Sequence, residues 1–420
     1  MKFVLANWGS RGDIEPCVAV GQELLSRGHD VRIAAPPDLV GFAGSAGSAA
    51  VAYGPDWSAT MERLRPFWGS YFRNPWRIQD LIRFGRETWE LYTRGWKEMS
   101  TVLTSVADGA DLLITGQSSE LQASGIAEYY RIPLATLHFH PLRAHSRDVM
   151  TTVYEWQFWL TQKRLEDGQR RELGLPKATG VAARRITGRG SLEIQAYDEV
   201  CFPGLAAEWA KFNGQRPFVG ALTLELPTEA DEEVASWIAA GTPPIYFGFG
   251  SPAVASAAKT LAMIDAACKQ LGERALVCAG GTDFSSLPHF EHVKLVGAVS
   301  HAAIFPACRA VVHHGGAGTT AAGLRAGMPT LILWNLPAQA PWGTAVKRLK
   351  VGTARRFSNT TEKSLVADLR TILDPQCAAR ARAIATRMTE PTKNAGVAAD
   401  LVENLARSRR AGWPASGRLL

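Results

Sequence analysis

The residues with the clearest chemical potential lie in one glycine-rich segment, residues 311–329. This segment predicts a buried strand that ends at His313, a tight turn, and a helix that begins near Gly318. The free backbone N–H groups of a helix start bind anions, and glycines let phosphate oxygens approach the backbone closely. A histidine at the strand end adds a donor that can become cationic. The segment therefore predicts a diphosphate site, with these contacts: His313, Gly315, Gly316, Gly318, Thr319 and Thr320.

Two other phosphate-binding patterns fit this chain less well. Residues 316–321 read G-x-G-x-x-A and match the dinucleotide fingerprint, which also needs an acidic residue at the end of the next strand. The next predicted strand, residues 330–333, is followed by Trp334 and Asn335 instead. The Walker pattern needs Gly-Lys-Ser or Gly-Lys-Thr, and neither occurs. An NAD-dependent oxidoreductase is therefore disfavoured, and a helix-packing turn without a ligand remains the structural alternative.

The elements that must position this segment form two series of strand–helix units. Each predicted strand is a short apolar run bounded by glycine or proline, with helical patterns between the runs, which is typical of parallel α/β sheets. In the first series the strands are residues 3–6, 31–35, 111–115 and 133–138. In the second series they are residues 244–249, 275–278, 293–296, 310–313 and 330–333. The predicted fold class is α/β, with two Rossmann-like domains.

The domain boundaries follow from length and composition. A chain of 420 residues favours two domains. Residues 213–233 combine glycines, prolines and an acidic cluster, which is typical of an interdomain linker that leads into a helix. We therefore expect domains at residues 1–215 and 216–390, followed by a C-terminal helix and tail at residues 391–420.

Bulk properties restrict the class of protein. Apolar residues make up 46% of the chain and charged residues 20%, which indicates a globular protein. The net charge is +7, and arginines are densest near the C-terminus. A solvated basic face and contact with an anionic membrane leaflet both explain this charge. Nucleic-acid binding is disfavoured, because no helix-turn-helix or zinc-finger spacing accompanies the charge.

Cysteine spacing and hydropathy bear on the compartment. The six cysteines are widely spaced and form no C-x-x-C pair, which argues against a zinc site or a disulfide framework. No apolar run is long enough to span a bilayer, and the N-terminus lacks the pattern of a signal peptide. We therefore expect a cytoplasmic protein, with peripheral contact at the inner face of the membrane as an open alternative.

Two motifs carry a family resemblance. Residues 313–329 resemble the donor-binding signature of family 1 glycosyltransferases with the GT-B fold. Residues 9–16, Gly-Ser-Arg-Gly-Asp-Ile-Glu-Pro, resemble the N-terminal motif of the branch that contains glycopeptide-antibiotic, mycobacterial glycolipid (rhamnosyl-type) and sterol glycosyltransferases. The motifs lie about 300 residues apart, in the expected halves. The resemblance covers roughly the first 40 residues and residues 245–345.

The resemblance implies a division of labour between the domains. The N-terminal domain would bind the acceptor, the C-terminal domain would bind a nucleotide diphosphate sugar, and the last helix would return to pack on the N-terminal domain. Asp13 would be the general base that removes the proton from the acceptor hydroxyl, in a single displacement that inverts the anomeric centre. The alternative role for Asp13 is to cap its own helix.

The same resemblance assigns donor contacts. His313 and residues 315–320 would hold the diphosphate and stabilise its leaving charge, with Ser251 and Ser10 as further phosphate contacts. Val299 and His301 correspond to residues that pack against the nucleobase. His314 has no assigned role. No Asp-x-Asp sequence and no metal-ligand spacing occur, which favours a metal-independent reaction without a cofactor beyond the donor substrate.

One departure from the family pattern concerns the sugar. The family usually carries an Asp-Gln pair after the donor signature, whereas this chain has Ala338 followed by Gln339, with Trp342 nearby. Gln339 and Trp342 remain as predicted sugar contacts. Loss of a carboxylate weakens binding of a fully hydroxylated hexose. The sequence therefore favours a 6-deoxysugar such as rhamnose on dTDP or UDP, and a divergent, inactive donor site is the alternative.

The acceptor side is indicated by aromatic residues. Residues 57–96 are rich in tryptophan and tyrosine and have little strand character. They form either a core or an apolar acceptor groove or lipid-facing flap. The predicted acceptor contacts are Trp8, Trp68, Trp76, His138 and His140. The expected partners are a nucleotide-sugar donor and an apolar or lipid-linked acceptor, such as a glycolipid or glycopeptidolipid. A GT-B epimerase or hydrolase and a non-catalytic nucleotide-sugar-binding protein are the rivals.

Overall fold

The computed structural model describes residues 1–45, 47–64, 78–141, 162–250, 256–280, 282 and 290–412. Three residues with predicted contacts, Ser251, Trp68 and Trp76, lie outside this described part of the chain. None of the helices in the described part is both long and apolar enough to cross a membrane. All six cysteines are buried free thiols.

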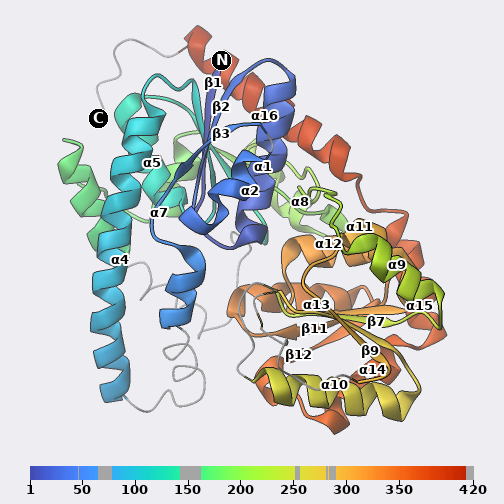
Figure 1. Ribbon diagram of the computed structural model, residues 1–420. Helices are drawn as coiled ribbons and strands as arrows, with labels where there is room; N and C mark the ends of the chain where they lie inside the picture. The colour runs from blue at the N-terminus through green and yellow to red at the C-terminus, as the bar shows by residue number, and fades with distance from the viewer. Residues whose placement is uncertain are drawn as a thin grey trace.

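The first half forms a parallel sheet with helices on both faces (Figure 1). Its strand order is β3-β2-β1-β4-β5-β6. The strands are β1 (Lys2–Ala6), β2 (Asp30–Ala35), β3 (Ala49–Ala52), β4 (Leu112–Gly116), β5 (Leu134–His138) and β6 (Leu192–Gln195). The helices are α1 (Arg11–Ser26), α2 (Val40–Gly44), α4 (Ile78–Ala107), α5 (Glu120–Tyr130), α7 (Ala182–Gly188) and α8 (Leu205–Trp209).

The second half repeats this architecture. Its strand order is β12-β11-β10-β7-β8-β9, all parallel. The strands are β7 (Ile245–Gly248), β8 (Ala275–Cys278), β9 (Val293–Val296), β10 (Ala310–His313), β11 (Thr330–Trp334) and β12 (Gly352–Arg356). The helices are α9 (Asp231–Ala239), α10 (Ala257–Leu271), α11 (His301–Ile304), α12 (Ala317–Arg325), α13 (Ala340–Arg348), α14 (Glu362–Ile372) and α15 (Pro375–Ala385). The predicted α/β fold with two Rossmann-like units is confirmed.

Burial of each sheet on both faces explains the continuous apolar strands. In β1, Phe3 and Leu5 join the core beneath α1, whereas Val4 and Ala6 join the core beneath α4 and α5. Each sheet has one point where the strand order reverses, between β1 and β4 and between β10 and β7. Ligands of open α/β sheets bind outside the carboxyl ends of the strands at such points. The two points therefore locate the candidate site.

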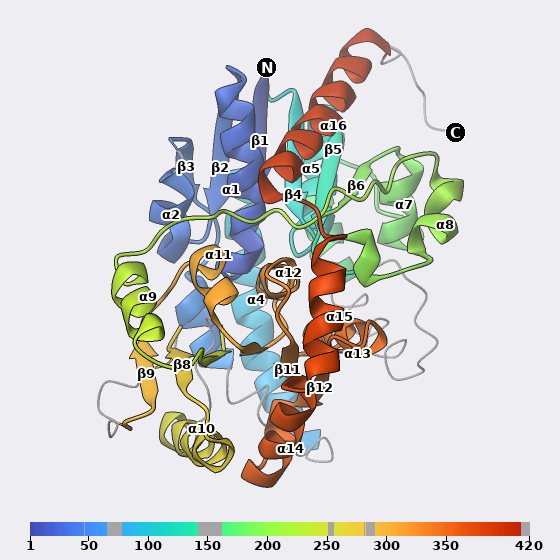
Figure 2. The same cartoon turned by 90° about the vertical axis from the view of Figure 1, so that its right-hand side faces the viewer.

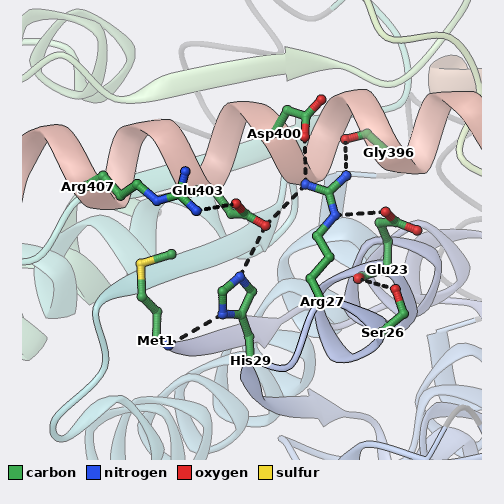
Figure 3. Close-up of polar contacts among 9 residues, drawn as sticks. All are labelled: Met1, Glu23, Ser26, Arg27, His29, Gly396, Asp400, Glu403 and Arg407. Carbon is green, nitrogen blue, oxygen red and sulfur yellow. Dashed lines mark hydrogen bonds and ion pairs between the residues drawn. The ribbon is translucent and has the colours of Figure 1, made fainter.

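The last helix, α16 (Pro391–Gly412), packs on α1 of the first half (Figure 2). Ala398, Ala399 and Val402 of α16 join the same apolar core as α1. Arg27 donates to Asp400 at 2.6 Å and to Glu403 at 3.1 Å (Figure 3). The contact therefore combines an apolar seam with a polar cluster at its edge.

Glu403 provides a test of this contact. Burial alone would raise the pKa of Glu403, but hydrogen bonds from His29 and Arg27 outweigh burial and lower it. A carboxylate with a lowered pKa stabilises the folded state above its ordinary pKa, and the stabilisation is lost as pH falls through the folded-state pKa. We expect Glu403→Gln to destabilise the protein by about 1–2 kcal/mol near neutral pH, measured by urea unfolding.

The matched control is Asp400→Asn, on the same helix and against the same arginine. The Asp400 side chain is 63% exposed, so its loss is expected to cost less than about 1 kcal/mol. The difference between wild type and Glu403→Gln should shrink in acid, once Glu403 is protonated. A difference that stays constant down to strongly acidic pH would contradict this role.

Candidate functional site

The turn between β10 and α12 depends on glycine. Gly315 has a φ of +92°, and a Cβ there would lie 2.9 Å from Cγ2 of Ile332. A side chain at this position is therefore excluded by conformation and by space. Gly316 is the N-cap of α12, and no side chain caps its N–H groups. The helix begins at Ala317, slightly earlier than expected, and its first N–H groups have no side-chain cap, as an anion site requires.

His313 is the buried side chain of this turn. It is 0% exposed, and its Nδ1 accepts a hydrogen bond from the Gly315 N–H at 3.0 Å. The proton of the neutral ring therefore sits on Nε2, which is buried and has no hydrogen-bond partner in the described part of the chain. Such unpaired buried groups are rare in folded proteins. This nitrogen is therefore a donor without a described partner at the end of β10.

The environment favours the neutral form of these histidines. Burial lowers the pKa of His313 well below its ordinary value, and the nearby His314 and His301 lower it further. Burial also lowers the pKa of His314 to about 4, and that of His301 to about 4. The surroundings of His313 therefore favour the neutral ring over the cationic form considered from the sequence.

His314 has a packing role that sequence reasoning missed. A Cβ at Gly316 would lie 2.7 Å from its Nε2, and one at Gly250 would lie 2.7 Å from its Cε1. The ring therefore fills the space between the ends of β7 and β10. The signal in the sequence was the pair of glycines at 250 and 316, which only the tertiary structure brings to one ring.

The predicted threonine contacts differ in their surroundings. Thr320 is buried, and its hydroxyl donates to the carbonyl of Gly316 at 2.7 Å. That hydroxyl is engaged within the helix, so it is not placed to donate to a ligand. Thr319 and Gly318 are partly exposed on the first turn of α12, where their N–H groups belong to the helix start.

The two predicted nucleobase residues lie after β9. Val299 is 8% exposed and joins an apolar core that contains Phe305. His301 begins α11, its ring stacks on Phe305 at 4.5 Å, and its Nε2 lies 3.3 Å from the Tyr246 hydroxyl. The Val299 side chain therefore serves packing, whereas His301 is partly exposed at the carboxyl edge of the sheet.

The two predicted sugar contacts, Gln339 and Trp342, have different surroundings. Gln339 accepts hydrogen bonds through Oε1 from the N–H groups of Asn335 and Leu336, at 2.8 and 3.0 Å. This arrangement holds the loop after β11. Trp342 is 2% exposed and contacts the rings of Tyr197 and Phe202 edge to face. Its indole is therefore part of the packing between the two halves and is not exposed to a ligand.

Asp13 lies at the start of α1, where Ser10 is the N-cap. The N–H and the hydroxyl of Ser10 both donate to Oδ2 of Asp13 at 2.8 Å. The capping role considered for Asp13 is thus present, and it occupies one carboxylate oxygen. Oδ1 has no hydrogen-bond donor in the described part of the chain. Burial raises the pKa of Asp13, and the bonds from Ser10 offset part of that rise.

Asn7 and Ser118, which sequence reasoning missed, fix the backbone beside Asp13. Asn7 donates to the carbonyl of Asp13 at 2.8 Å and accepts from the Ser118 hydroxyl at 2.7 Å. A Cβ at Gly116 would lie 2.1 Å from Nδ2 of Asn7, so the end of β4 must be glycine here. Only the pairing of β1 with β4 could have indicated this contact.

The described acceptor candidates lie on the same edge of the first sheet, at different depths. Trp8 donates to the carbonyl of Pro55 at 2.8 Å and packs against Trp57. His140 is partly exposed and lies 2.8 Å from the amide nitrogen of Gln117. His138 is fully buried, and its Nε2 lies 3.3 Å from Oε1 of Glu120.

The carboxyl edges of the two sheets, one from each half of the molecule, lie next to each other. After burial, the charge of Arg11 at the start of α1 is the next cause of the low pKa of His301. Glu15 of α1 accepts from the N–H of Leu224 at 2.7 Å, and a Cβ at Gly318 would lie 3.3 Å from Thr223. The starts of α1 and α12 are therefore neighbours, which brings the segment that carries Asp13 near the N–H groups that begin α12.

Comparison with known proteins identifies relatives of this chain. Residues 261–405 match the family model described as the C-terminal domain of erythromycin biosynthesis protein CIII-like proteins. The chain is 56% identical to an uncharacterized glycosyltransferase of Mycobacterium bovis, over 98% of this chain and 100% of that protein. It is 30% identical to the vancomycin aglycone glucosyltransferase of Amycolatopsis orientalis, over 96% and 97%.

The chain belongs to the family 1 glycosyltransferases with the GT-B fold. The glycosyltransferase also resembles the crystal structure of glycosyltransferase VinC in complex with dTDP, with a TM-score of 0.65 and 20% identity over 98% of this chain and 100% of that chain. In the described part of this glycosyltransferase, no three His, Cys, Asp or Glu side chains gather into a group that could hold a metal ion.

Proposed function

We propose that this glycosyltransferase transfers a 6-deoxyhexose such as rhamnose from a nucleotide diphosphate to a hydroxyl of an apolar acceptor, with inversion and without a metal ion. The preferred nucleotide is dTDP, with UDP as the second choice. The acceptor class is a glycolipid or glycopeptidolipid, and its recognition places the enzyme at the inner face of the membrane.

The unpaired Nε2 of His313 beside the uncapped start of α12 carries this proposal. A diphosphate there receives hydrogen bonds from the His313 Nε2–H and from the first N–H groups of α12. In the described part of the chain, that Nε2 has no partner and no side chain caps the helix start. These donors stabilise the charge that develops on the diphosphate as the bond to the anomeric carbon breaks. The helix dipole and neutral donors supply this stabilisation in place of a divalent cation.

Asp13 is the base of the proposed reaction. Ser10 holds Oδ2, so Oδ1 accepts the proton of the acceptor hydroxyl as its oxygen attacks the anomeric carbon. The new C–O bond forms on the face opposite the departing diphosphate, which inverts the anomeric centre. The raised pKa of Asp13 suits a group that accepts a proton during each turnover.

Donor identity rests on separate observations. Ala338 is exposed in the loop after β11, where a carboxylate would otherwise be available to sugar hydroxyls. Its methyl group suits a less hydroxylated sugar. VinC, which shares the fold, binds dTDP. Trp8, Trp57 and His140 provide an aromatic edge for the acceptor, next to Asp13.

Calorimetry with dTDP and with UDP in the presence of EDTA tests the nucleotide, followed by turnover of dTDP-rhamnose and dTDP-glucose with hydroxylated lipid acceptors. We expect tight dTDP binding in EDTA and acceptor-dependent transfer of rhamnose. Sugar release or isomerisation without acceptor would support an epimerase or hydrolase instead. Nucleotide binding without any turnover would support a non-catalytic binding protein.

A further inference from the structure

Two chain segments connect the halves of the molecule, and they touch (Figure 2). Residues 213–230 lead from the first sheet to α9, and residues 386–390 lead from α15 to α16. A Cβ at Gly220 would lie 1.9 Å from the hydroxyl of Thr389, and Asn394 donates to the carbonyl of Ala221 at 3.0 Å. Any rotation of one half against the other must therefore act on this crossing point.

A charged residue from each half holds one of these segments. Arg325, the last residue of α12, donates through Nη2 to the hydroxyl of Thr223 in the first segment, at 2.8 Å. Asp198, which follows β6, accepts through Oδ1 from the N–H and the hydroxyl of Thr389 in the second segment, at 2.6 and 2.7 Å. The two side chains thus flank the crossing point from opposite halves.

Each of these side chains keeps one buried atom without a partner. Nη1 of Arg325 and Oδ2 of Asp198 are buried and make no hydrogen bond to any described residue. Burial lowers the pKa of Arg325, and the charge of Asp198 is the foremost influence that opposes this, followed by Glu225 and Glu15. An unpaired buried donor and an unpaired buried acceptor of opposite charge therefore lie near each other without a bond, which costs free energy.

We propose that Arg325 and Asp198 form a hinge ion pair that is open in this structure and closes when a nucleotide diphosphate binds at the start of α12. The inference rests on the proposed function, because the donor nucleotide is the ligand that moves α12. The bond joins Nη1 to Oδ2, while Nη2 and Oδ1 keep their present partners. Both unpaired atoms are satisfied only in the closed form.

The rigidity of α12 connects this pair to the reaction. The helix carries donor contacts at its first turn and Arg325 at its last, so one movement shifts both ends. Glu15 accepts from the N–H of Leu224, which is adjacent to Thr223, and lies on α1 close to Asp13. The pair therefore sets the distance between Asp13 and the donor site. Arg325 is a positioning residue, and closure excludes water from the donor.

A double-mutant cycle tests this inference. The variants are Arg325→Met, Asp198→Asn and the combination, with Arg325→Lys as a second variant that keeps the charge. We expect each single change to weaken dTDP binding by about tenfold, and the double change to weaken it no further. Thermal unfolding without nucleotide should show weaker coupling than dTDP binding does, because the two charges are not hydrogen-bonded in the open state.

Small-angle scattering provides an independent measure of closure. Wild type should become more compact with dTDP, and the double variant should not. The matched control is Arg348→Met, another arginine between the halves, which already donates to the carbonyl of Cys201. This control should lower the unfolding midpoint while leaving dTDP binding and compaction as in wild type.

The outcomes separate this inference from the proposed function. Coupling between Arg325 and Asp198 in unfolding but not in dTDP binding would show a static ion pair and overturn the hinge. A double variant that binds dTDP and compacts like wild type would also overturn it while leaving the proposed function intact. If the wild type binds neither dTDP nor UDP, both the proposed function and the hinge inference that rests on it are overturned.

Discussion

Asp13→Asn is expected to lower kcat by about 100- to 10,000-fold, the range typical for loss of a general base. Asparagine keeps the size of the side chain and an oxygen for the bonds from Ser10, so the start of α1 should persist. It cannot accept the acceptor proton. dTDP affinity should stay within about twofold of wild type, because the proposed diphosphate donors lie on β10 and α12. Steady-state kinetics with calorimetry measure both quantities.

The pH profile of wild type supports the same assignment. Because burial raises the pKa of Asp13, the ionised base is lost on acidification at a higher pH than for an ordinary aspartate. Activity should therefore rise with pH through the pKa of Asp13 and level off above it. An Asp13→Asn enzyme that keeps wild-type kcat would reduce this residue to a helix cap.

Gly9 offers an approach to the same carboxylate through the backbone. A Cβ there would lie 2.5 Å from Oδ2 and 2.7 Å from Cβ of Asp13, so Gly9→Ala must displace the whole side chain. We expect kcat to fall while dTDP binding is retained. Gly12→Ala is the matched control, since its Cβ would meet only Oγ of Ser10, at 3.8 Å.

His313→Ala is expected to weaken dTDP binding by about 10- to 100-fold and to lower kcat further, because a donor to a charged diphosphate is lost. The substitution also removes the acceptor for the Gly315 N–H, so the turn loses a bond. Calorimetry in EDTA measures the affinity. Circular dichroism checks that the fold persists.

His292→Ala is the control for this substitution. His292 lies in the same half and pairs with Asp265 at 3.0 Å, away from the turn between β10 and α12. The His292→Ala variant should bind dTDP as the wild type does. Equal loss in both variants would indicate general destabilisation, and no loss in His313→Ala would remove this residue from the donor site.

Local patterns in the sequence were sufficient for most of the strands and for the turn after β10. The periodicity of apolar residues and the glycines at 315 and 316 act over a few residues, so the strand–turn–helix order could be predicted there. This pattern predicted nine of the twelve strands, and β3, β6 and β12 were not predicted. These strands lie at the sheet edges, where β12 is only half-buried and therefore lacks a continuous apolar run.

Burial of individual site residues required the tertiary structure. Trp342 followed the donor signature and therefore resembled a sugar contact, yet Tyr197 and Phe202, far away in the chain, enclose it. Thr320 is engaged by its own helix. The exposure of a side chain depends on which segments pack against it. The sequence of a single segment does not show which other segments these are.

The sequence by itself determined the family, the α/β architecture and the segments that carry Asp13 and His313, because motif, periodicity and turn chemistry are local properties. Only the tertiary structure decided which side-chain atoms have no hydrogen-bond partner among the described residues: Oδ1 of Asp13, Nε2 of His313, Nη1 of Arg325 and Oδ2 of Asp198. Hydrogen-bond partners come from residues that are distant in the chain, so the unpaired donors and acceptors of a site are defined only once the chain has folded.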